Sequence, residues 1–420
     1  MHAFYYPARC HRTHRIADLQ PSESAILAGR LIEGQLTDET GSVALHIQPG
    51  LEPVHPGDIV EFEGTWKPPT FQVQTIRLLA PAKIQTRPGP DAKIRNNLRI
   101  RSQILSAIRT FFESRDFLEV ETPLLTRCPG QEPHLTAFET RYQDVQTGLK
   151  LYLPTSPEYA MKRLLASGFE TIYQICKAFR HETASSMHNP EFTILEWYRA
   201  YADYKAIMSD TEAVVYELAQ RITKSPTLTY QDKSVDLTPP WQRLTVHEAF
   251  AQFADIHADP SADPDGFLQQ AKTHPSVNPD DPFGLAYFKV FLDSVEPHLG
   301  HPKPTFLLDY PASMAALAKR KPDAPHLAER FELYIAGIEL ANAFTELNDP
   351  EEQRIRLESE AQERKTSGAP AYPIDTQFLA ALKSGLPPAG GIALGVDRLI
   401  MLFTNATSIR EVIAFPFPEL

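Results

Sequence analysis

The chain has 420 residues, of which 42% are hydrophobic and 22% charged, so it can form two or three folded domains and is neither disordered nor collagen-like. Its 41 Lys+Arg and 53 Asp+Glu give a net charge of −12, which argues against a protein whose main task is to neutralise nucleic-acid phosphates. The three cysteines form no Cys-x-x-Cys pair, so neither a disulfide framework nor a structural zinc site is expected. No apolar run approaches the ~18 residues of a membrane helix, and a cytoplasmic protein with no membrane partner is expected.

Short apolar runs separated by turn residues predict a small β domain over residues 25–85, preceded by an N-terminal arm over residues 1–24. Pro88 and Pro90 can continue neither a strand ladder nor a helix, so residues 86–97 are predicted to form a linker. The first 90 residues hold 8 Lys+Arg and 9 Asp+Glu, a balance that is poor for strong RNA binding.

Helical and strand-like patterns alternate over residues 98–420, which predicts one larger α+β domain with an antiparallel sheet flanked by helices. An amphipathic helix is expected from Leu98 onward, and further helices are expected at residues 158–166, 204–222, 283–298 and 350–365. Strands are expected at residues 117–123, 171–179, 192–200, 305–310 and 331–344. The Pro/Asp-rich segment 259–282 is expected to be an exposed insertion or a long loop.

The densest group of polar residues that could carry chemistry lies between residues 179 and 201. On a strand with a period of two residues, Phe192, Glu196 and Tyr198 share one face, and this face is polar where a core would be apolar. A solvated sheet face with surface ion pairs is the simpler interpretation. The many large apolar neighbours favour partial burial instead, and buried charges need partners.

A second acidic group lies between residues 331 and 346. If Ala336 and Gly337 form a two-residue hairpin turn, Glu332 and Glu339 converge on one face. Two converging carboxylates repel each other unless a cation lies between them, and hard oxygen ligands suit Mg²⁺. Glu346 departs from the alternation and requires a bulge or the end of the strand. An exposed acidic strand remains the alternative.

Two further segments are weaker signals when taken alone. The glycine-rich residues 390–395 permit close approach of a ligand, and Arg398 at a helix start could reach a phosphate, although a structural strand-to-helix turn explains the same pattern. Ser156 and Glu158 stand at a predicted helix start, where a carboxylate commonly acts as a cap.

Together these segments resemble the three signature motifs of class II aminoacyl-tRNA synthetases, here at residues 117–123, 179–201 and 391–399. The resemblance runs from about residue 94 to 415 and is closest to the lysine branch. That branch includes the elongation factor P lysine ligases, which attach β-lysine to a protein lysine. The resemblance implies a catalytic domain over residues 98–420, an OB-like N-terminal domain and a homodimer formed through residues 117–123.

The resemblance also implies sites for ATP, Mg²⁺ and an amino acid. Arg180 would hold the α-phosphate and, with Arg398, would be catalytic. Mg²⁺ would be held by Glu332 and Glu339. The residues implied to bind ATP are Arg180, Glu182, His188, Asn189, Phe192, Glu339, Leu340, Gly395 and Arg398. The residues implied to bind the amino acid are Ser156, Glu158, Glu196, Tyr198, Asn342, Glu346 and Ala393.

These implied roles differ along the site. Glu182 and Asn189 would contact the adenine edge, Phe192 its ring face, and His188 and Arg398 the outer phosphates. In the amino-acid site, Glu158 and Glu196 would take the ammonium near the carboxylate, while Tyr198 and Glu346 would take the side-chain ammonium. Charge-assisted bonds to carboxylates are a suitable replacement for the hydration of two ammonium groups.

The acceptor of the activated amino acid decides the function within the branch. Residues 31–47 look too short for the usual first three strands of an anticodon-binding barrel, and Ala393 stands where the synthetases usually have glycine and the protein ligases alanine. Residues 345–350 and 201–205 are more typical of the synthetases, and residues 183–187 lack the arginine usual in both. The sequence favours transfer of lysine or β-lysine to elongation factor P, with a compact enzyme charging tRNA(Lys) as the alternative. An inactive paralogue acting as a binding module is a third hypothesis.

Overall fold

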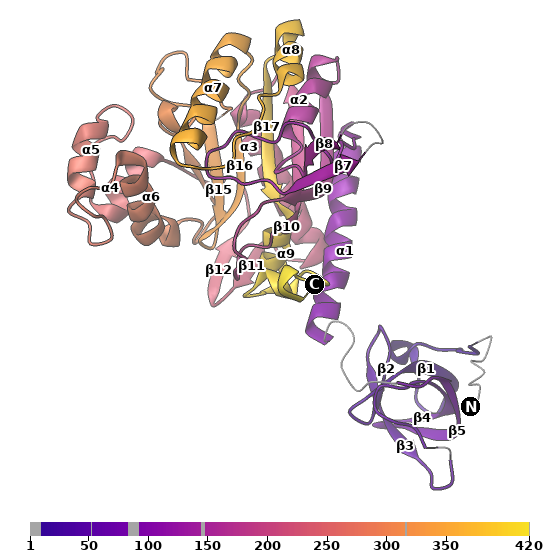
Figure 1. Ribbon diagram of the computed structural model, residues 1–420. Coiled ribbons are helices and arrows are strands. Elements are labelled where there is room, and N and C mark those ends of the chain that lie inside the picture. The colour runs from indigo at the N-terminus through magenta and orange to yellow at the C-terminus, as the bar shows by residue number, and fades with distance from the viewer. Residues whose placement is uncertain (1–9, 52, 83–91, 144–147, 316, 420) are drawn as a thin grey trace. The chain divides into compact units, whose positions relative to one another are not determined.

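The computed structural model describes residues 10–419 apart from 52, 83–91, 144–147 and 316. It divides into two compact units, Met1–Arg95 and Asn96–Leu420 (Figure 1). Part of the predicted arm (residues 1–9) and part of the predicted linker (residues 86–91) lie outside the described residues. Residues 92–97, also assigned to the linker, form the first turns of α1 (Ala92–Glu113), because α1 contains no proline and Ile94 and Leu98 continue the apolar stripe of the helix.

The first unit is a closed five-stranded barrel with strand order β1-β2-β3-β5-β4, consistent with the expected OB-like domain. Its strands are β1 (Ser24–Ile32), β2 (Gln35–Thr37), β3 (Ser42–Ile47), β4 (Ile59–Lys67) and β5 (Thr70–Ala80). The barrel closes where β1 pairs with β4, and β3 runs parallel to β5. The expectation that residues 31–47 are too short was therefore wrong, because a three-residue β2 is enough to carry the chain from β1 to β3.

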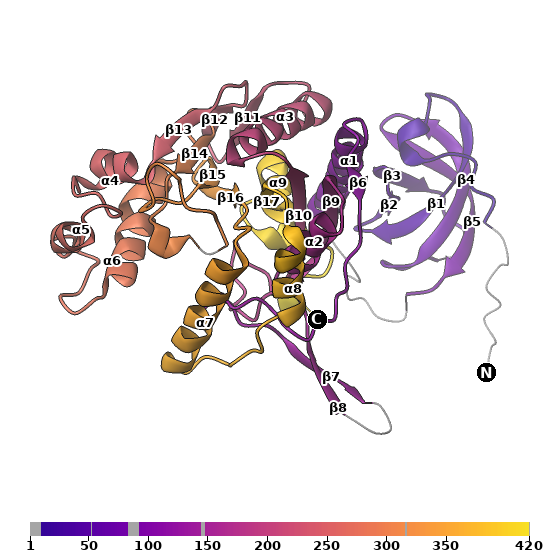
Figure 2. The same ribbon diagram turned by 90° about the horizontal axis from the view of Figure 1, so that it is seen from above.

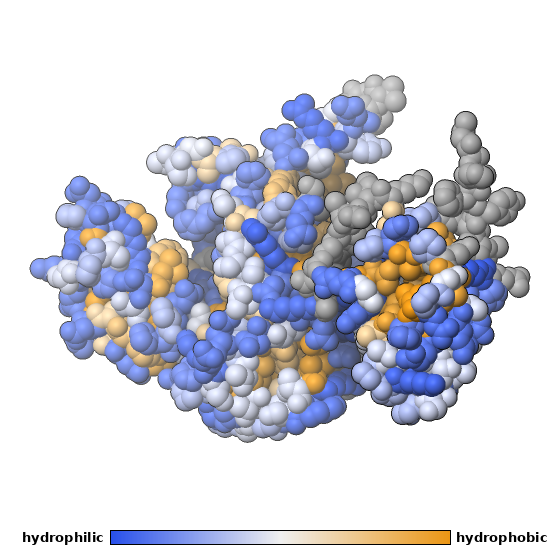
Figure 3. Space-filling view, turned by 90° about the horizontal axis from the view of Figure 1, so that it is seen from below, coloured by the Kyte–Doolittle hydropathy of each residue, from blue (hydrophilic) through white to orange (hydrophobic). Residues whose placement is uncertain are grey.

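The barrel core is apolar and tightly closed. Leu27, Leu36, Phe62 and Phe71 are buried in it, and Figure 3 shows hydrophobic residues gathered on one side of the barrel surface. Gly64 is required on β4, because a side chain there would clash with the main chain of the neighbouring strand β5.

The second unit is built on an eight-stranded sheet with order β13-β14-β15-β16-β17-β10-β9-β6. These strands are β6 (Leu118–Glu119), β9 (Thr171–Phe179), β10 (Glu191–Ala200), β13 (Gln242–Thr245), β14 (Thr305–Leu308), β15 (Arg330–Ile335), β16 (Ile338–Thr345) and β17 (Ala389–Gly395). The pairs are antiparallel except β13–β14 and β6–β9 at the two edges. The predicted α+β class is confirmed. Two small hairpins, β7 (Glu139–Gln143) with β8 (Gly148–Tyr152) and β11 (Thr227–Tyr230) with β12 (Lys233–Asp236), lie outside this sheet.

Helices cover the sheet in two groups (Figure 2). The apolar residues of α1, α3 (Tyr204–Ile222) and α9 (Val396–Thr404) share one core with Leu195 and Trp197 of β10. The helices α2 (Glu158–Ala166), α7 (Pro350–Thr366) and α8 (Thr376–Gly385) form a separate core around Tyr198. Because Trp197 and Tyr198 point to opposite faces of β10, the second group of helices borders the face that carries Glu196.

The segment 259–282 is part of a helical subdomain with its own core, rather than an exposed loop. Its helices are α4 (Val246–Ala254), α5 (Pro264–Ala271) and α6 (Phe283–Val290). Phe250, Phe267 and Tyr287 are buried against one another. The Pro/Asp-rich composition concealed a helix start, since Asp263 caps α5 and Pro264 occupies its first turn. None of the helices in the described ranges combines the length and the apolar character needed to cross a bilayer.

Candidate active site

Strand register brings four of the implied site residues into one row across the sheet. Glu332 of β15 pairs with Asn342 of β16, Asn342 with Ala393 of β17, and Ala393 with Glu196 of β10. Paired residues of neighbouring strands project from the same face, so these side chains form a continuous polar row. The Ala393 methyl group lies between Glu196 and Asn342, where glycine would leave open space.

The next row of the same face contains a residue that the sequence analysis did not single out for binding. Gly391 pairs with Phe344 on one side and Tyr198 on the other. A Cβ at this position would clash with Glu346 Oε1 and with the ring of Tyr198. Only glycine leaves room between these groups. The two consecutive glycines at 390–391 were the feature of the sequence that could have indicated this close packing.

Glu196 is buried on this face, and the group that it forms with Glu158, Glu346 and Lys162 is called the carboxylate pocket below. The Ser156 hydroxyl donates to Glu196 Oε1 at 2.6 Å and the Tyr198 hydroxyl donates to its Oε2 at 2.9 Å. The side chain is fully buried, and burial together with the nearby Glu158 carboxylate raises its pKa to about 8. A buried carboxylate of this kind favours a positively charged ligand, which can replace the hydrogen bonds that the carboxylate no longer makes to water.

Glu346 enters the pocket from the end of β16, as the departure from alternation predicted. Its main-chain N–H donates to Ala389 O at 2.8 Å, which directs the side chain inward. Burial raises its pKa to about 8 although the ammonium of Lys162 acts in the opposite direction. Its Oε2 forms an ion pair with Lys162 Nζ, while Oε1 is buried and accepts no hydrogen bond from any described residue.

Glu158 stands in the first turn of α2 and contributes a third carboxylate, rather than the capping bond that its position suggested. Its main-chain N–H donates to Ser156 Oγ at 3.0 Å, while its carboxylate contacts Lys162 Nζ at 2.6 Å. Lys162 is fully buried and also forms an ion pair with Glu346. The sequence analysis missed Lys162, whose position among the apolar residues Met161 and Leu165 was the only signal.

Arg180 directly follows the last residue of β9. Its guanidinium carbon is 5.0 Å from the centre of the Phe192 ring. Its Nε is buried and makes no hydrogen bond to any described residue. A buried cationic donor without a partner, next to an aromatic ring on a sheet face, is suited to a phosphate linked to a stacked base.

Arg398, in the first turn of α9, is held between two of the implied ATP residues. It donates to Glu339 O at 2.7 Å, lies 3.4 Å from Glu339 Oε2 and contacts His188 Nε2 at 2.9 Å. Burial and the Arg398 charge lower the pKa of His188. Since arginine only donates, His188 Nε2 accepts this bond, and His188 thereby orients Arg398.

The hairpin predicted between β15 and β16 is confirmed. Ala336 and Gly337 have φ values of 55° and 83°, and Tyr334 pairs with Glu339. Glu332 lies on the same face, where its carboxylate accepts hydrogen bonds from Tyr310 and Tyr334 at 2.5 and 2.6 Å.

The donor set of this hairpin suits Mg²⁺. Arg330 donates to Glu332 Oε1 at 2.7 Å, so Glu332 is already well satisfied. Among the described residues, the Glu339 carboxylate accepts one long hydrogen bond, from Arg398 at 3.4 Å, and is the freer acceptor. Burial and the charges of Glu339 and Glu332 raise the pKa of Glu296 to about 7. Hard carboxylate oxygens are the ligands that Mg²⁺ prefers, so Glu339 would hold the ion, and Glu332 would join it by exchanging one of its three hydrogen bonds for the ion.

Four implied ATP residues contribute less directly. Glu182 is exposed in the loop after β9. The Asn189 side chain donates to Glu191 O at 2.6 Å and accepts from Phe417 N at 2.9 Å, so its amide is already used within the chain. Leu340 is buried in the core, and Gly395 is the N-terminal cap of α9. The other implied ATP residues have side chains that contact one another: Arg180 with Phe192, and His188 with Arg398. They are therefore the stronger candidates for ATP binding.

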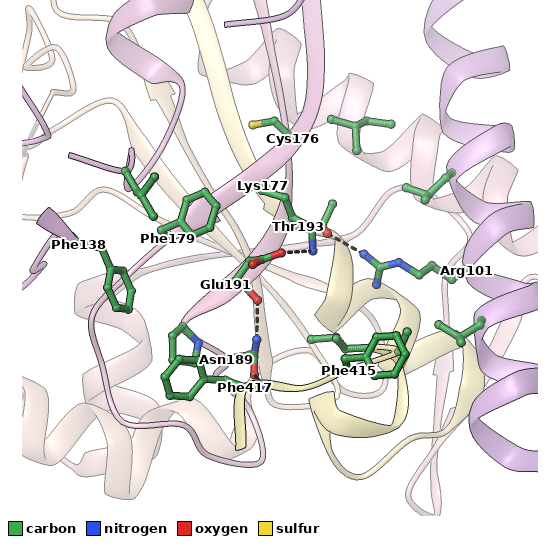
Figure 4. Close-up of a pocket in the computed structure, with 17 residues that line it drawn as sticks. Arg101, Phe138, Cys176, Lys177, Phe179, Asn189, Glu191, Thr193, Phe415 and Phe417 are labelled. Carbon is green, nitrogen blue, oxygen red and sulfur yellow. Dashed lines mark hydrogen bonds and ion pairs between the residues drawn. The ribbon is translucent and has the colours of Figure 1, made fainter. Parts of the chain in front are cut away.

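A hollow of about 820 Å³ lies between α1, β9 and residues 413–417 (Figure 4). Arg101 donates to Thr193 Oγ1 there, and Phe138, Phe179 and Phe415 line the walls. Asn189 is the only implied site residue among its lining residues, so this groove is distinct from the carboxylate pocket.

Comparison with known proteins agrees with this geometry. Residues 90–419 match the family described as tRNA synthetases class II (D, K and N). Lysine–tRNA ligases of Trichormus variabilis and Pelotomaculum thermopropionicum are 40% and 43% identical over 329 and 323 residues, which are 77% and 75% of this chain and 57% and 62% of those proteins. The lysine–tRNA ligase of Moorella thermoacetica is 43% identical over 318 residues, 75% of this chain and 64% of that protein.

The chain thus spans about three fifths of the length of these curated relatives. The family match, by contrast, extends over most of the chain and includes every residue of the carboxylate pocket and of the Arg180–Arg398 region. The chain belongs to the class II tRNA synthetases of the D, K and N group.

Proposed function

We propose that this protein is an ATP-dependent ligase that activates lysine, or a close diamino analogue such as β-lysine, as an aminoacyl-adenylate. The observation that carries the proposal is the convergence of Glu158, Glu196 and Glu346 on one group of buried side chains. Glu196 and Glu346 are fully buried and Glu158 is half-buried, and three carboxylates exceed what the one ammonium of Lys162 neutralises, so together they suit a substrate with two ammonium groups.

The reaction needs no protein nucleophile. An oxygen of the substrate carboxylate attacks the α-phosphorus of ATP, and the bond from that phosphorus to the bridging oxygen of pyrophosphate breaks as pyrophosphate leaves with the electron pair. Arg180 would stabilise charge on the α-phosphate, and Arg398, oriented by His188, charge on the leaving group. Bound Mg²⁺, held by Glu339 and Glu332, would neutralise phosphate charge. Phe192 offers a face for adenine.

The names of the relatives support tRNA(Lys) as the acceptor, better than the elongation factor that the sequence analysis placed first. Elongation factor P remains a second candidate because of two observations. The Ala393 methyl group narrows the pocket between Glu196 and Asn342, and the barrel unit carries almost no net charge. Either acceptor implies a cytoplasmic enzyme. The homodimer expected through residues 117–123 stays a prediction.

An acceptor-exchange experiment tests this choice. The wild-type protein is incubated with ATP, Mg²⁺ and labelled lysine or β-lysine, and either tRNA(Lys) or purified elongation factor P is added. Labelled tRNA that is sensitive to mild alkali supports tRNA charging. A mass increase of one acyl group on the factor, with no labelled tRNA, would contradict tRNA as the acceptor.

The pocket carboxylates predict a pH-dependent affinity for lysine. Glu196 and Glu346, which face Glu158, Lys162 and Tyr198, both have pKa values of about 8, so each is largely protonated in the empty pocket at pH 6. A ligand with two ammonium groups requires the ionised carboxylates, and binding therefore releases protons. The KM for lysine should fall by at least ~10-fold between pH 6 and pH 8, while the KM for ATP serves as the control. A KM for lysine independent of pH would contradict this assignment.

A further inference from the structure

The interior of the proposed amino-acid pocket contains a cation of its own. Lys162 is fully buried, and its ammonium lies between Glu158, at 2.6 Å, and Glu346. The rings of Phe344 and Phe378 lie 5.2 and 6.0 Å from the same nitrogen. Both carboxylates are within ion-pairing distance, so the ammonium acts on the pocket through its charge.

The ammonium of Lys162 stays charged in this environment. Burial alone would lower its pKa, but the carboxylates of Glu158 and Glu346 outweigh burial and raise it. In turn, the ammonium opposes the effect of burial on Glu196 and Glu346, whose ionised forms it favours. The four groups are thus electrostatically coupled, although they come from α2, β10 and the end of β16.

We propose that Lys162 is a specificity-determining positioning residue: once the three carboxylates are ionised, as a ligand with two ammonium groups requires, its buried ammonium sets their net charge at −2. Three carboxylates and one ammonium give this sum. This inference rests on the proposed function. Without Lys162, three like charges in one buried pocket would keep at least one carboxyl protonated, and a protonated carboxyl is a poor partner for a second ammonium group.

Charged groups farther from the pocket have partners of their own. Glu132 and Glu360 also face Glu158, but Arg364 and Arg180 act on Glu132 and Arg356 acts on Glu360. The pairing leaves Lys162 as the cation shared by Glu158 and Glu346 in the described part of the chain. A change at Lys162 should therefore alter the pocket more than a change at any of these arginines.

The test measures lysine binding by isothermal titration calorimetry between pH 6 and pH 9, for the full chain with Lys162→Met, which preserves side-chain length and removes the charge. Removal of the opposing charge should raise the pKa values of Glu196 and Glu346 further, so the dissociation constant for lysine should rise at least ~30-fold at pH 7. The difference should narrow toward pH 9. Discrimination between lysine and 6-hydroxynorleucine, which lacks the terminal charge, should fall in the same variant.

Controls separate a charge effect from a loss of structure. Lys162→Arg keeps the charge and should recover most of the affinity, and Arg163→Met, an exposed neighbour on α2, should change nothing. ATP binding and the melting temperature report on the fold. Three results in Lys162→Met would overturn the proposal. The dissociation constant for lysine could rise equally at every pH, it could stay unchanged, or it could fall, which would mean that Lys162 competes with the substrate.

Calorimetry of lysine binding, together with an exchange assay, distinguishes this inference from the proposed function. A wild-type protein that binds lysine but catalyses no lysine-dependent ATP–pyrophosphate exchange would contradict the ligase activity, while the ratio of binding constants still decides the role of Lys162. A wild-type protein that binds no lysine at all would overturn both.

Discussion

Replacement of Arg180 by alanine is expected to lower the rate of adenylate formation by at least ~10²- to 10³-fold while the fold is retained. The Arg180 guanidinium carbon lies 5.0 Å from the centre of the Phe192 ring, and its buried Nε makes no hydrogen bond to any described residue. Since this donor would stabilise charge that develops on the α-phosphate, its removal should act mainly on kcat rather than on the KM for lysine.

The rate is measured as lysine-dependent ATP–pyrophosphate exchange. Arg180→Lys should recover little of the activity, because a point charge does not reproduce the planar donor. Arg221→Ala removes an exposed arginine from the last turn of α3 and is the matched control. Normal exchange in Arg180→Ala, with a melting temperature close to wild type, would remove Arg180 from the site.

Glu346→Gln is expected to raise the KM for lysine by roughly 30- to 100-fold and to leave the KM for ATP unchanged. The loss of one charge-assisted bond in a buried site corresponds to about 2 kcal/mol. The glutamine keeps the size of the side chain, and Glu158 remains in contact with the Lys162 ammonium, so the pocket should keep its shape. Activation of 6-hydroxynorleucine should change little, because a neutral amide can still bond its hydroxyl.

The matched control for this substitution is Glu358→Gln, on the exposed face of α7. Equal loss of activity with lysine and with 6-hydroxynorleucine would indicate a collapsed pocket rather than a lost charge contact. An unchanged KM for lysine would show that Glu346 does not bind the substrate side chain.

The strands β9, β10, β15 and β16 could be predicted from local patterns because they are long and strongly patterned, whereas the four-residue β13 and the glycine-rich β17 were not predicted as strands. The assignment of residues to the two faces of β10 follows from a period of two residues. The hairpin turn at Ala336 and Gly337 follows because such a turn requires residues that tolerate a positive φ. The helix α5 was not predicted, because the proline and aspartate that start it are also the residues of loops.

The candidate site was only partly predictable for a different reason. A glutamate and a lysine four residues apart on a helix, such as Glu158 and Lys162, are typical of a surface ion pair. Their burial arises only when α2 packs against α8 and against the end of β16, which places Glu346 beside them. Likewise, the amide of Asn189 is taken up by the distant Phe417, a contact that no local pattern reveals.

The central claim, that the carboxylate pocket selects a diamino acid for adenylation, is tested most directly by ATP–pyrophosphate exchange near pH 8 with a panel of amino acids. We predict rapid exchange with lysine or β-lysine and at least ~100-fold slower exchange with norleucine, which has the same chain length and one ammonium group. Comparable exchange with norleucine and lysine, or no exchange with any diamino acid in the presence of Mg²⁺, would contradict the claim.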